Sequence, residues 1–325
     1  MIVVMKQSAT EEQISRVVKH LLDLGFDPYR STGKVQTILA AIGERPFDKN
    51  DLELFDGVQE VVRISLPYKL ASRNSKPENT VIKVKDIELG GSGIAITVRV
   101  VASNSFHQVE QIYTRLAQEG VKLATVTLSE KQPSEKQLKE YRAVADSLGL
   151  LLVARPKSLQ EVAKACHYCD ILEVGTLSNR LFLEEASKAD KPLIVSRLPS
   201  MSIEEVLVLA ESVLSLGIEK VIICEQGVRM LDPLIAQSLD ISAITAIKRL
   251  SHLPVFADPC AAMGRRDRVA PMALAAAVGG VDGLVFDILA SNEQYGTPQA
   301  LTFTQFLELL QQLRLIVSAI GRRLL

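Results

Sequence analysis

The feature that most restricts the fold is an alternation of short apolar segments with helical patterns, which starts at Ile94 and continues to the end of the 325-residue chain. Such alternation is typical of buried parallel strands that are connected by helices. The predicted strands are Ile94–Val101, Lys122–Leu128, Leu150–Ala154, Ile171–Val174, Leu193–Val195, Lys220–Cys224, Val255–Asp258 and Gly283–Phe286. Eight such units predict a (β/α)8 barrel. An open, doubly wound sheet is the alternative, because alternation alone does not establish closure.

The residues before this region predict a small α+β domain. Strand patterns at Met1–Met5, Val35–Ile42 and Val58–Leu66 are interleaved with two helical patterns. Thr10 is a predicted N-cap, and Gln13 stands at the capping-box position of the first helix. The order βαββαβ is that of a ferredoxin-like domain.

The chain therefore divides into three predicted parts. They are a ferredoxin-like, regulatory-type domain at 1–70, a linker and hairpin at 71–93, and the (β/α)8 barrel at 94–325. Gly90–Gly93 is rich in glycine and is predicted to be the tight turn of the hairpin.

Composition excludes several classes of partner. Hydrophobic residues make up 47% and charged residues 23%, and the net charge of −1 provides no field that would attract nucleic acid or an anionic membrane. No apolar run is long enough to span a bilayer, and the first residues have no signal-peptide layout. The four cysteines are expected to be free thiols in a reducing compartment, which predicts a cytoplasmic protein.

In a barrel, functional residues follow the strands at their carboxyl ends. The segments to inspect are Ala102–Ser105, Ser129–Gln132, Gly175–Asn179, Ser196–Leu198, Glu225–Arg229, Asp258–Arg266 and Asp287–Gly296.

Several long stretches resemble type I DAHP (3-deoxy-heptulosonate-7-phosphate) synthases of the subgroup that carries an N-terminal ferredoxin-like domain. They are MIVVMKQSATEEQISRVVKHLLDLGF, VQEVVRISLPYKLASR, VIICEQGVRM, LDISAITAIKRLSHLPVFADPCAAMGRRDRVAP and GGVDGLVFDI, which follow the family in order and spacing. The resemblance covers nearly the whole chain. It implies the condensation of phosphoenolpyruvate with erythrose 4-phosphate, the first step of the shikimate pathway.

The resemblance also implies a divalent metal held by a Cys, a His, a Glu and an Asp. Ser105 stands in the place of the Cys, Ala261 in that of the His and Asp287 in that of the Glu, while Gly296 is the nearest equivalent of the Asp. A hydroxyl is a poor substitute for a thiolate, and alanine has no donor atom. We therefore expect that the family's metal site is lost and that no cofactor is bound.

The phosphate contacts implied by the family are also changed. The loop at Ser129–Ser134 lacks the family's Lys-Pro-Arg-Thr motif, and Gly175–Ser178 replaces a Gly-Ala-Arg-Asn. Gln226 replaces an arginine, although Arg197 of the Lys-Arg-Gly motif is kept.

The charged residues that remain at the strand ends admit two interpretations. These candidate ligand-binding residues are Arg197, Glu225, Arg229, Asp258, Arg265 and Arg266. They either bind a different anionic ligand or form a layer of structural ion pairs, and we favour the layer.

Two cysteine arrangements are candidate sites. Cys166 and Cys169 form a Cys-x-x-Cys, but without a second pair or a thioredoxin-like context helix packing is favoured. Cys260, Asp258 and Asp287 are the residues from which a metal site could have been rebuilt.

Three hypotheses for function follow. The first is a catalytically silent paralogue that binds or regulates, as a homo-oligomer or in a hetero-assembly with an active DAHP synthase. The second is an enzyme of altered chemistry, with Arg197, Arg229 and Arg265 holding an anion and Asp287 or Glu225 acting as base. The third is an active DAHP synthase with a rebuilt site.

Overall fold

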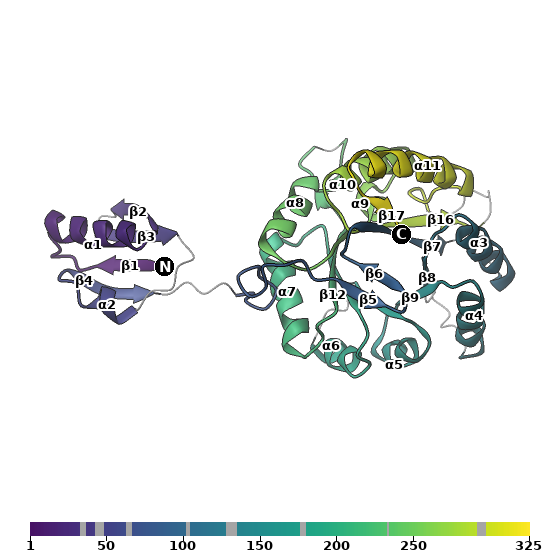
Figure 1. Ribbon diagram of the computed structural model, residues 1–325, viewed down its shortest axis with the longest axis horizontal. Helices are drawn as coiled ribbons and strands as arrows, with labels where there is room; N and C mark the ends of the chain where they lie inside the picture. The colour runs from purple at the N-terminus through teal and green to yellow at the C-terminus, as the bar shows by residue number, and fades with distance from the viewer. Residues whose placement is uncertain are drawn as a thin grey trace. The chain divides into compact units, whose positions relative to one another are not determined.

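The computed structural model describes residues 1–32, 37–42, 49–62, 67–101, 105–127, 135–175, 180–232, 234–290 and 297–325. The chain forms two compact units, Met1–Pro67 and Tyr68–Leu325 (Figure 1). The boundary predicted after residue 70 lies close to this division.

The first unit is a ferredoxin-like domain, as predicted. Its elements are β1 (Ile2–Met5), α1 (Glu11–Asp23), β2 (Asp27–Thr32), β3 (Thr37–Ile42), α2 (Lys49–Glu53) and β4 (Val58–Val62). The four strands form an antiparallel sheet in the order β2-β3-β1-β4. The predicted capping box of α1 is confirmed, because Thr10 and Gln13 exchange side-chain-to-backbone hydrogen bonds.

One strand of this sheet has no sequence signal. β2 reads Asp-Pro-Tyr-Arg-Ser-Thr and lacks an apolar alternation. Within the described ranges it is an edge strand whose partner is β3, and the edge is where a sheet tolerates the missing N–H of Pro28. The remainder of the predicted strand at Val58–Leu66, beyond Val62, lies outside the described residues.

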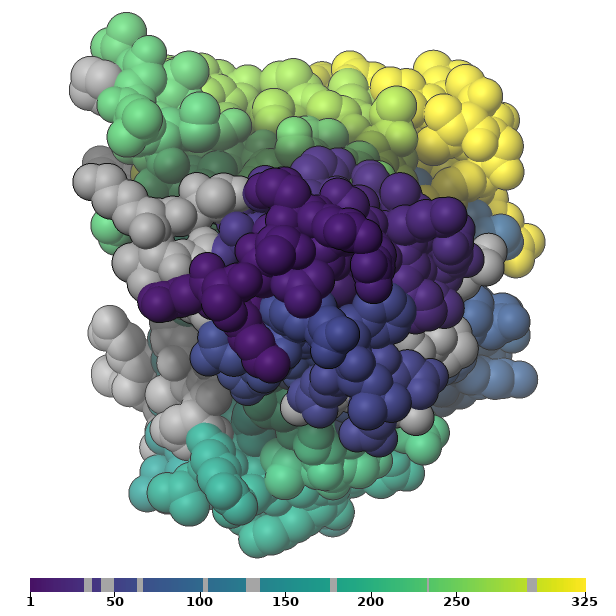
Figure 2. Space-filling view, turned by 90° about the vertical axis from the view of Figure 1, so that its left-hand side faces the viewer, coloured from purple at the N-terminus to yellow at the C-terminus, as the bar shows by residue number. Residues whose placement is uncertain are grey.

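The first unit has its own core and its own exposed apolar side chains. Val3, Met5, Val17 and Leu39 are fully buried between the sheet and α1. Large apolar side chains are exposed on its surface, which is purple to blue in Figure 2; they include Leu22 at 54%, Tyr29 at 57% and Leu54 at 82%.

The second unit is a closed parallel barrel, which confirms the predicted fold and excludes the open sheet. Its strands are β7 (Gly93–Val101), β8 (Leu123–Thr127), β9 (Leu151–Arg155), β10 (Ile171–Val174), β11 (Leu193–Arg197), β12 (Val221–Glu225), β15 (Val255–Ala257) and β16 (Gly283–Leu289). Neighbours along this order are hydrogen-bonded, and β16 pairs with β7 to close the ring.

Helices surround the barrel (Figure 1). They are α3 (Phe106–Gln118), α4 (Glu135–Ser147), α5 (Leu159–Tyr168), α6 (Arg180–Ser187), α7 (Ile203–Ser215), α8 (Ile241–Leu250), α9 (Pro259–Met263), α10 (Arg266–Val278) and α11 (Phe303–Ala319). Two short strands, β13 (Val228–Arg229) and β14 (Gln237–Ser238), pair after β12, and β17 (Arg323–Leu324) pairs with the start of β7.

A hairpin packs against the amino end of the barrel. β5 (Ile82–Val84) and β6 (Ile87–Leu89) are antiparallel, and their buried side chains share one apolar cluster with the first residues of the barrel strands, such as Leu151 and Ile171. The turn predicted at Gly90–Gly93 is wrong. The turn lies at Lys85–Asp86, where Lys85 has a φ of 53°, and the glycines join the hairpin to β7.

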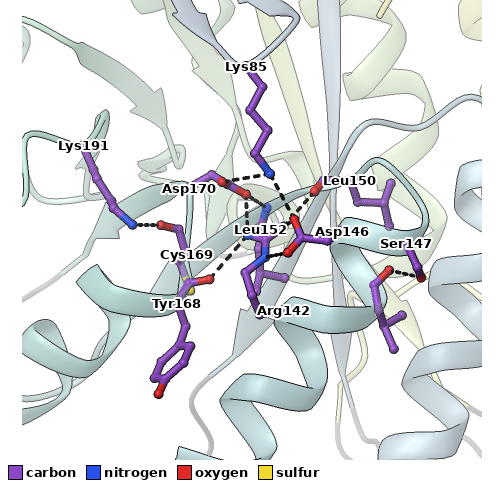
Figure 3. A network of polar contacts seen from close by, with 11 residues as sticks. Lys85, Arg142, Asp146, Ser147, Leu150, Leu152, Tyr168, Cys169, Asp170 and Lys191 are labelled. Atoms are coloured by element: carbon purple, nitrogen blue, oxygen red, sulfur yellow. Dashed lines mark hydrogen bonds and ion pairs between the residues drawn. The ribbon is translucent and has the colours of Figure 1, made fainter.

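Ion pairs fasten this hairpin to the barrel (Figure 3). Lys85 lies 3.3 Å from both Asp146, at the end of α4, and Asp170, just before β10. Arg142 forms ion pairs with Asp146 and Asp170, each at 2.7 Å, and Asp170 also accepts a hydrogen bond from the Leu152 N–H. The turn is therefore held by a network of alternating charges.

No helix in the described parts of the chain has both the length and the apolar character needed to cross a lipid bilayer.

Candidate functional site

Strand alternation places a charged layer inside the barrel. Ala95 of β7 belongs to the apolar layer at the amino end of the barrel, and side chains two residues apart share one face of a strand. Thr97 and Arg99 of the same strand therefore point inward, farther along the barrel axis. By the same alternation Glu173 of β10 and Asp287 of β16 point inward.

Arg99 is the centre of this layer. Its Nε donates to Asp287 Oδ1 at 2.6 Å, and its Nη2 donates to Asp258 Oδ2 at 2.5 Å. Arg99 and Asp287 are direct partners in the β7–β16 register, so closure of the barrel brings them together. Asp258 follows β15, and its exposed fraction is 0%.

Asp258 also organises the segment after its strand. Its second oxygen, Oδ1, accepts the backbone N–H of Ala261 at 2.9 Å and so caps α9. Cys260 lies beside this cap, and its Sγ accepts the backbone N–H of Asp287 at 3.3 Å. Burial raises the pKa of the Cys260 thiol well above its ordinary value, which keeps it protonated.

The electrostatics of the layer depend on Arg99. Burial alone would lower the pKa of Arg99, but Asp258, Asp287 and Glu173 outweigh it and raise this pKa well above its ordinary value. Burial raises the pKa of Asp258, while Arg99 opposes the shift. The arginine is therefore a permanent charge, and it is what makes buried carboxylates tolerable.

Contacts on the far side of Arg99 are looser. Arg99 Nη1 and Arg155 Nε each lie 3.6 Å from Glu173 Oε1, which is longer than a hydrogen bond. Arg99 Nη1 and Glu173 Oε1 are buried and have no hydrogen-bond partner among the described residues. Buried polar atoms in proteins seldom lack a hydrogen-bond partner. The space beside Arg99 Nη1 and Glu173 Oε1 is therefore one where a ligand or water would bind.

A second charged cluster joins β11 and β12. Arg197 Nη1 donates to Glu225 Oε2 at 2.7 Å and lies 3.5 Å from Asp240, the N-cap of α8. Glu225 Oε1 accepts the Gly227 N–H at 2.7 Å. Burial raises the pKa of Glu225 to about 7, because the loss of solvation outweighs the attraction of Arg197. This cluster lies at the strand ends but is separate from that of Arg99.

The other predicted site residues lie outside these two clusters. Ser105 is exposed and caps α3 by accepting the Gln108 N–H. Arg229 is exposed, Arg265 is exposed and pairs with Asp267 at 3.0 Å, and half-buried Arg266 donates to Ala300 O. A ligand-binding role for these arginines stays a prediction.

Three of the predicted site segments lie outside the described residues. They are Gly296, the loop at 129–134 and residues 176–178.

The Cys-x-x-Cys pair is part of the helical layer. Cys166 lies in α5 and Cys169 directly follows it, and both thiols are free. Burial raises the pKa of Cys169 to about 12 and that of Cys166 above its ordinary value. Neither is the reactive thiolate that redox or metal chemistry requires.

The residues at the strand ends do not fit the metal site that the family implies. Ala261 has no donor, Ser105 is used as a helix cap, and the Asp287 carboxylate is bonded to Arg99. Within the described ranges no group of three or more His, Cys, Asp or Glu side chains is arranged to hold a metal ion.

Sequence reasoning missed Arg99, Arg155 and Glu173. A signal was present, because Arg99 interrupts the apolar run of β7 and Glu173 that of β10. A charged residue at an inward position of a buried strand is informative, since such residues are buried only when paired.

Comparison with known proteins shows which family this chain is similar to. The DAHP synthase ferredoxin-like domain family matches residues 1–66, and the DAHP synthetase I family matches residues 131–319. Phospho-2-dehydro-3-deoxyheptonate aldolase of Thermotoga maritima is 32% identical over 334 residues, which cover 99% of both chains. The crystal structure of DAHP synthase from Thermotoga maritima has a TM-score of 0.78 at 31% identity and covers 100% of this chain and 99% of that one. A truncated 3-deoxy-D-arabino-heptulosonate 7-phosphate synthase from the same organism has a TM-score of 0.74 at 29% identity and covers 80% of this chain and 100% of that one.

Proposed function

This chain belongs to the type I DAHP synthase family, and we propose that it catalyses an aldol-type condensation of that family in a site rebuilt without the family's metal ligands. The expected substrates are those of the family, phosphoenolpyruvate and erythrose 4-phosphate. Similarity that covers both domains of an enzyme at 32% identity supports a shared reaction class.

One observation carries the proposal. Three buried side-chain N–H donors have no hydrogen-bond partner in the parts of the chain that are described: Arg99 Nη1, inside the barrel on β7, and Arg197 Nε and Gln226 Nε2 of the separate cluster where β11 and β12 end. An unsatisfied buried donor is costly, and an anionic or carbonyl oxygen would satisfy it. Phosphorylated, carboxylated substrates supply such oxygens.

Glu225 is the group best suited to proton transfer. In the proposed condensation, C3 of phosphoenolpyruvate bonds to the aldehyde carbon, the aldehyde oxygen takes up a proton, water adds at C2, and inorganic phosphate leaves as the C2 ketone forms. A carboxyl group with a pKa of about 7 is populated in both of its forms near neutral pH, as a general acid or base must be. Glu225 precedes Gln226, which carries one of the three unsatisfied donors.

The test is an assay for DAHP formation from phosphoenolpyruvate and erythrose 4-phosphate, run with added Mn²⁺ and with chelator. We expect product formation that survives chelation, falls at least about tenfold in Arg99→Lys and is insensitive to Arg180→Lys. The exposed Arg180 is the matched control, because its ion pair with Glu184 lies within α6 and outside the charged layer.

Two outcomes contradict the proposal. If no product forms above the level of a no-protein blank, the chain does not have the proposed activity. Activity that requires Mn²⁺ and is lost in Asp287→Ala would mean that a metal site has been rebuilt.

A silent, binding or regulatory paralogue is the second candidate, favoured by one observation. Asp258 and Asp287 are already bonded to Arg99, so these carboxylates need no further cation. We propose for this case a homo-oligomer or a hetero-assembly with an active DAHP synthase, through the exposed apolar side chains of the ferredoxin-like unit, such as Tyr29 and Leu54. Native mass spectrometry of the two chains mixed would detect the assembly, and Leu54→Glu is expected to weaken it.

A further inference from the structure

Arg155 and Glu173 stand next to each other at the carboxyl ends of two hydrogen-bonded strands, β9 and β10. Val153 of β9 and Ile171 of β10 belong to the apolar cluster inside the barrel. Side chains two residues farther along a strand share the same face, so Arg155 and Glu173 also point into the barrel. They are therefore placed to meet a ligand that enters at the strand ends.

Solvent reaches Arg155 but hardly reaches its charged neighbours. The exposed fraction of the side chain is 30% for Arg155, 4% for Glu173 and 5% for Arg99. A solute that enters from water therefore meets Arg155 first, and it meets Glu173 only after it has left the solvent. A planar guanidinium at such an opening suits a phosphate, which it binds through two parallel hydrogen bonds.

The guanidinium of Arg155 is positioned by packing, and its N–H groups are available. A Cβ at Gly175, directly after β10, would lie 2.9 Å from Arg155 Nη2 and 3.2 Å from Arg155 Nε, so a larger residue there would displace the guanidinium. Among the described residues, the opposite charge beside Arg155 is Glu173 Oε1 at 3.6 Å, which is longer than a hydrogen bond. Arg155 can therefore donate hydrogen bonds to a ligand.

Two buried atoms beside Arg155 need complementary partners. Arg99 Nη1 is a donor and Glu173 Oε1 is an acceptor, they lie 3.6 Å apart, and neither has a hydrogen-bond partner within the described ranges. A hydroxyl group between them would accept from the first and donate to the second. Thr125, the partner of Arg99 in the β7–β8 register, adds a buried hydroxyl that also lacks a described partner. This part of the barrel therefore suits a hydroxylated molecule.

We propose that Arg155 and Glu173 form a recognition pair for a phosphate ester that carries hydroxyl groups. Arg155 binds the phosphate at the opening, and Glu173 together with Arg99 binds a hydroxyl group deeper in the barrel. The inference rests on the proposed function for its class of substrate, and it distinguishes between the two substrates. Erythrose 4-phosphate has both a phosphate and hydroxyl groups, whereas phosphoenolpyruvate has no hydroxyl group to donate to Glu173 Oε1.

The test compares the binding of two unreactive phosphates to the full-length chain by isothermal titration calorimetry, without phosphoenolpyruvate. D-Erythritol 4-phosphate keeps the phosphate and the hydroxyl groups of erythrose 4-phosphate. n-Butyl phosphate has a carbon chain of the same length but no hydroxyl groups on it. We expect the wild-type chain to bind the erythritol phosphate at least about tenfold more tightly, because only its hydroxyl groups satisfy the buried donor and acceptor.

Two variants separate the roles of the pair. Arg155→Lys is expected to weaken the binding of both phosphates about tenfold, because a lysine does not reproduce the two parallel hydrogen bonds of a guanidinium. Glu173→Gln is expected to weaken the binding of the erythritol phosphate alone and to reduce its preference over butyl phosphate to about threefold, because a neutral amide oxygen is the weaker acceptor. A merely structural role of Glu173 would change both affinities equally.

Arg314→Lys is the matched control. The side chain of Arg314 is 45% exposed and donates to the backbone oxygen of Glu119, the C-cap of α3. Glu119 lies shortly before β8, at the amino ends of the strands, so this arginine is at the opposite end of the barrel. We expect the variant to bind both phosphates as the wild type does. Circular dichroism and the Tm of each variant show whether the fold is kept.

Three results would overturn the inference. They are equal affinity of the wild-type chain for the two phosphates, no binding of either at millimolar concentrations, which would leave only water in this space, and undiminished binding in Arg155→Lys. If Glu173→Gln does not fold, the wild-type preference and Arg155→Lys decide. An inactive chain that shows the preference would contradict the proposed function alone, and an active chain without the preference would contradict this inference alone.

Discussion

Each carboxylate oxygen of Asp258 has its own role. Because the side chain is buried, the loss of its charge is expected to reduce the stability of the fold. One carboxylate oxygen binds Arg99 and the other caps α9, and the side chain is fully buried. We predict that Asp258→Asn destabilises the chain by about 3–5 kcal/mol, because it removes one of the two carboxylates that are hydrogen-bonded to the buried Arg99. Denaturant unfolding measures this change.

Asp267 is the matched control for Asp258, because it is also an aspartate paired with an arginine but is exposed. Its ion pair with Arg265 is exposed at 62% on both sides, and Asp267→Asn is expected to cost less than about 1 kcal/mol. Equal costs for the two variants would show that burial does not set the value of these charges.

Glu225 predicts a pH dependence of stability. Burial raises its pKa in the folded chain to about 7, above the ordinary value of 4.5. The folded state therefore holds this proton more tightly than the unfolded state does. The resulting stabilisation is fully present below about pH 4.5 and is lost as the pH rises to about 7.

Glu225→Gln tests this sign. The glutamine does not titrate, so the decrease in the free energy of unfolding between about pH 4.5 and 7 is expected to become smaller than in the wild type. Denaturant titrations at a series of pH values measure the difference between the two chains. A wild-type stability that rises across this window relative to the variant would contradict the shift.

At the scale of elements, Gly90 lies in the connection between the hairpin and β7, where the backbone packs closely against neighbouring residues. Its φ is +89°, and a Cβ there would lie 2.5 Å from Thr80 O and 2.6 Å from Pro254 Cγ. We predict that Gly90→Ala costs roughly 2–4 kcal/mol, from the left-handed backbone and the overlap together. Thermal and denaturant unfolding measure the cost.

Gly217 separates the two causes. It has nearly the same φ, +87°, but nothing lies within 4 Å of the position of its Cβ. Gly217→Ala is expected to cost about 1 kcal/mol, the backbone contribution alone. If both variants cost the same, close packing at Gly90 plays no part.

At the scale of the whole molecule, the two units have separate cores. Met1–Pro67 and Tyr68–Leu325 each enclose their own apolar cluster. A small domain buries a smaller fraction of its surface than a large one, so the barrel unit is expected to be the more stable. We predict that a chain starting at Tyr68 folds with a Tm within a few degrees of the higher transition of the full chain.

Circular dichroism melts of both chains make this comparison. A truncated chain that aggregates or melts without cooperativity would show that the barrel needs the first unit.

The sequence alone determined where the barrel strands and the capped first helix lie, because these elements have local signals of periodicity and capping. The eight apolar runs became the eight barrel strands, and Thr10 and Gln13 capped α1. The polar segment of β2 was invisible by the same rule, since only its pairing with β3 makes it a strand. The misplaced hairpin turn arose because glycines mark tight turns, whereas here they mark a close approach of Gly90 to Pro254.

Only the tertiary structure decided which charged residues meet. Arg99 and Asp287 are 188 positions apart and become neighbours only when β16 pairs with β7. Arg197, Arg229 and Arg265 are all arginines near strand ends, yet the first is buried in an ion pair and the other two are exposed. The alternation within a strand predicts which face of the sheet a side chain points to. Which residues it contacts depends on the closure of the barrel, which cannot be predicted from one strand alone.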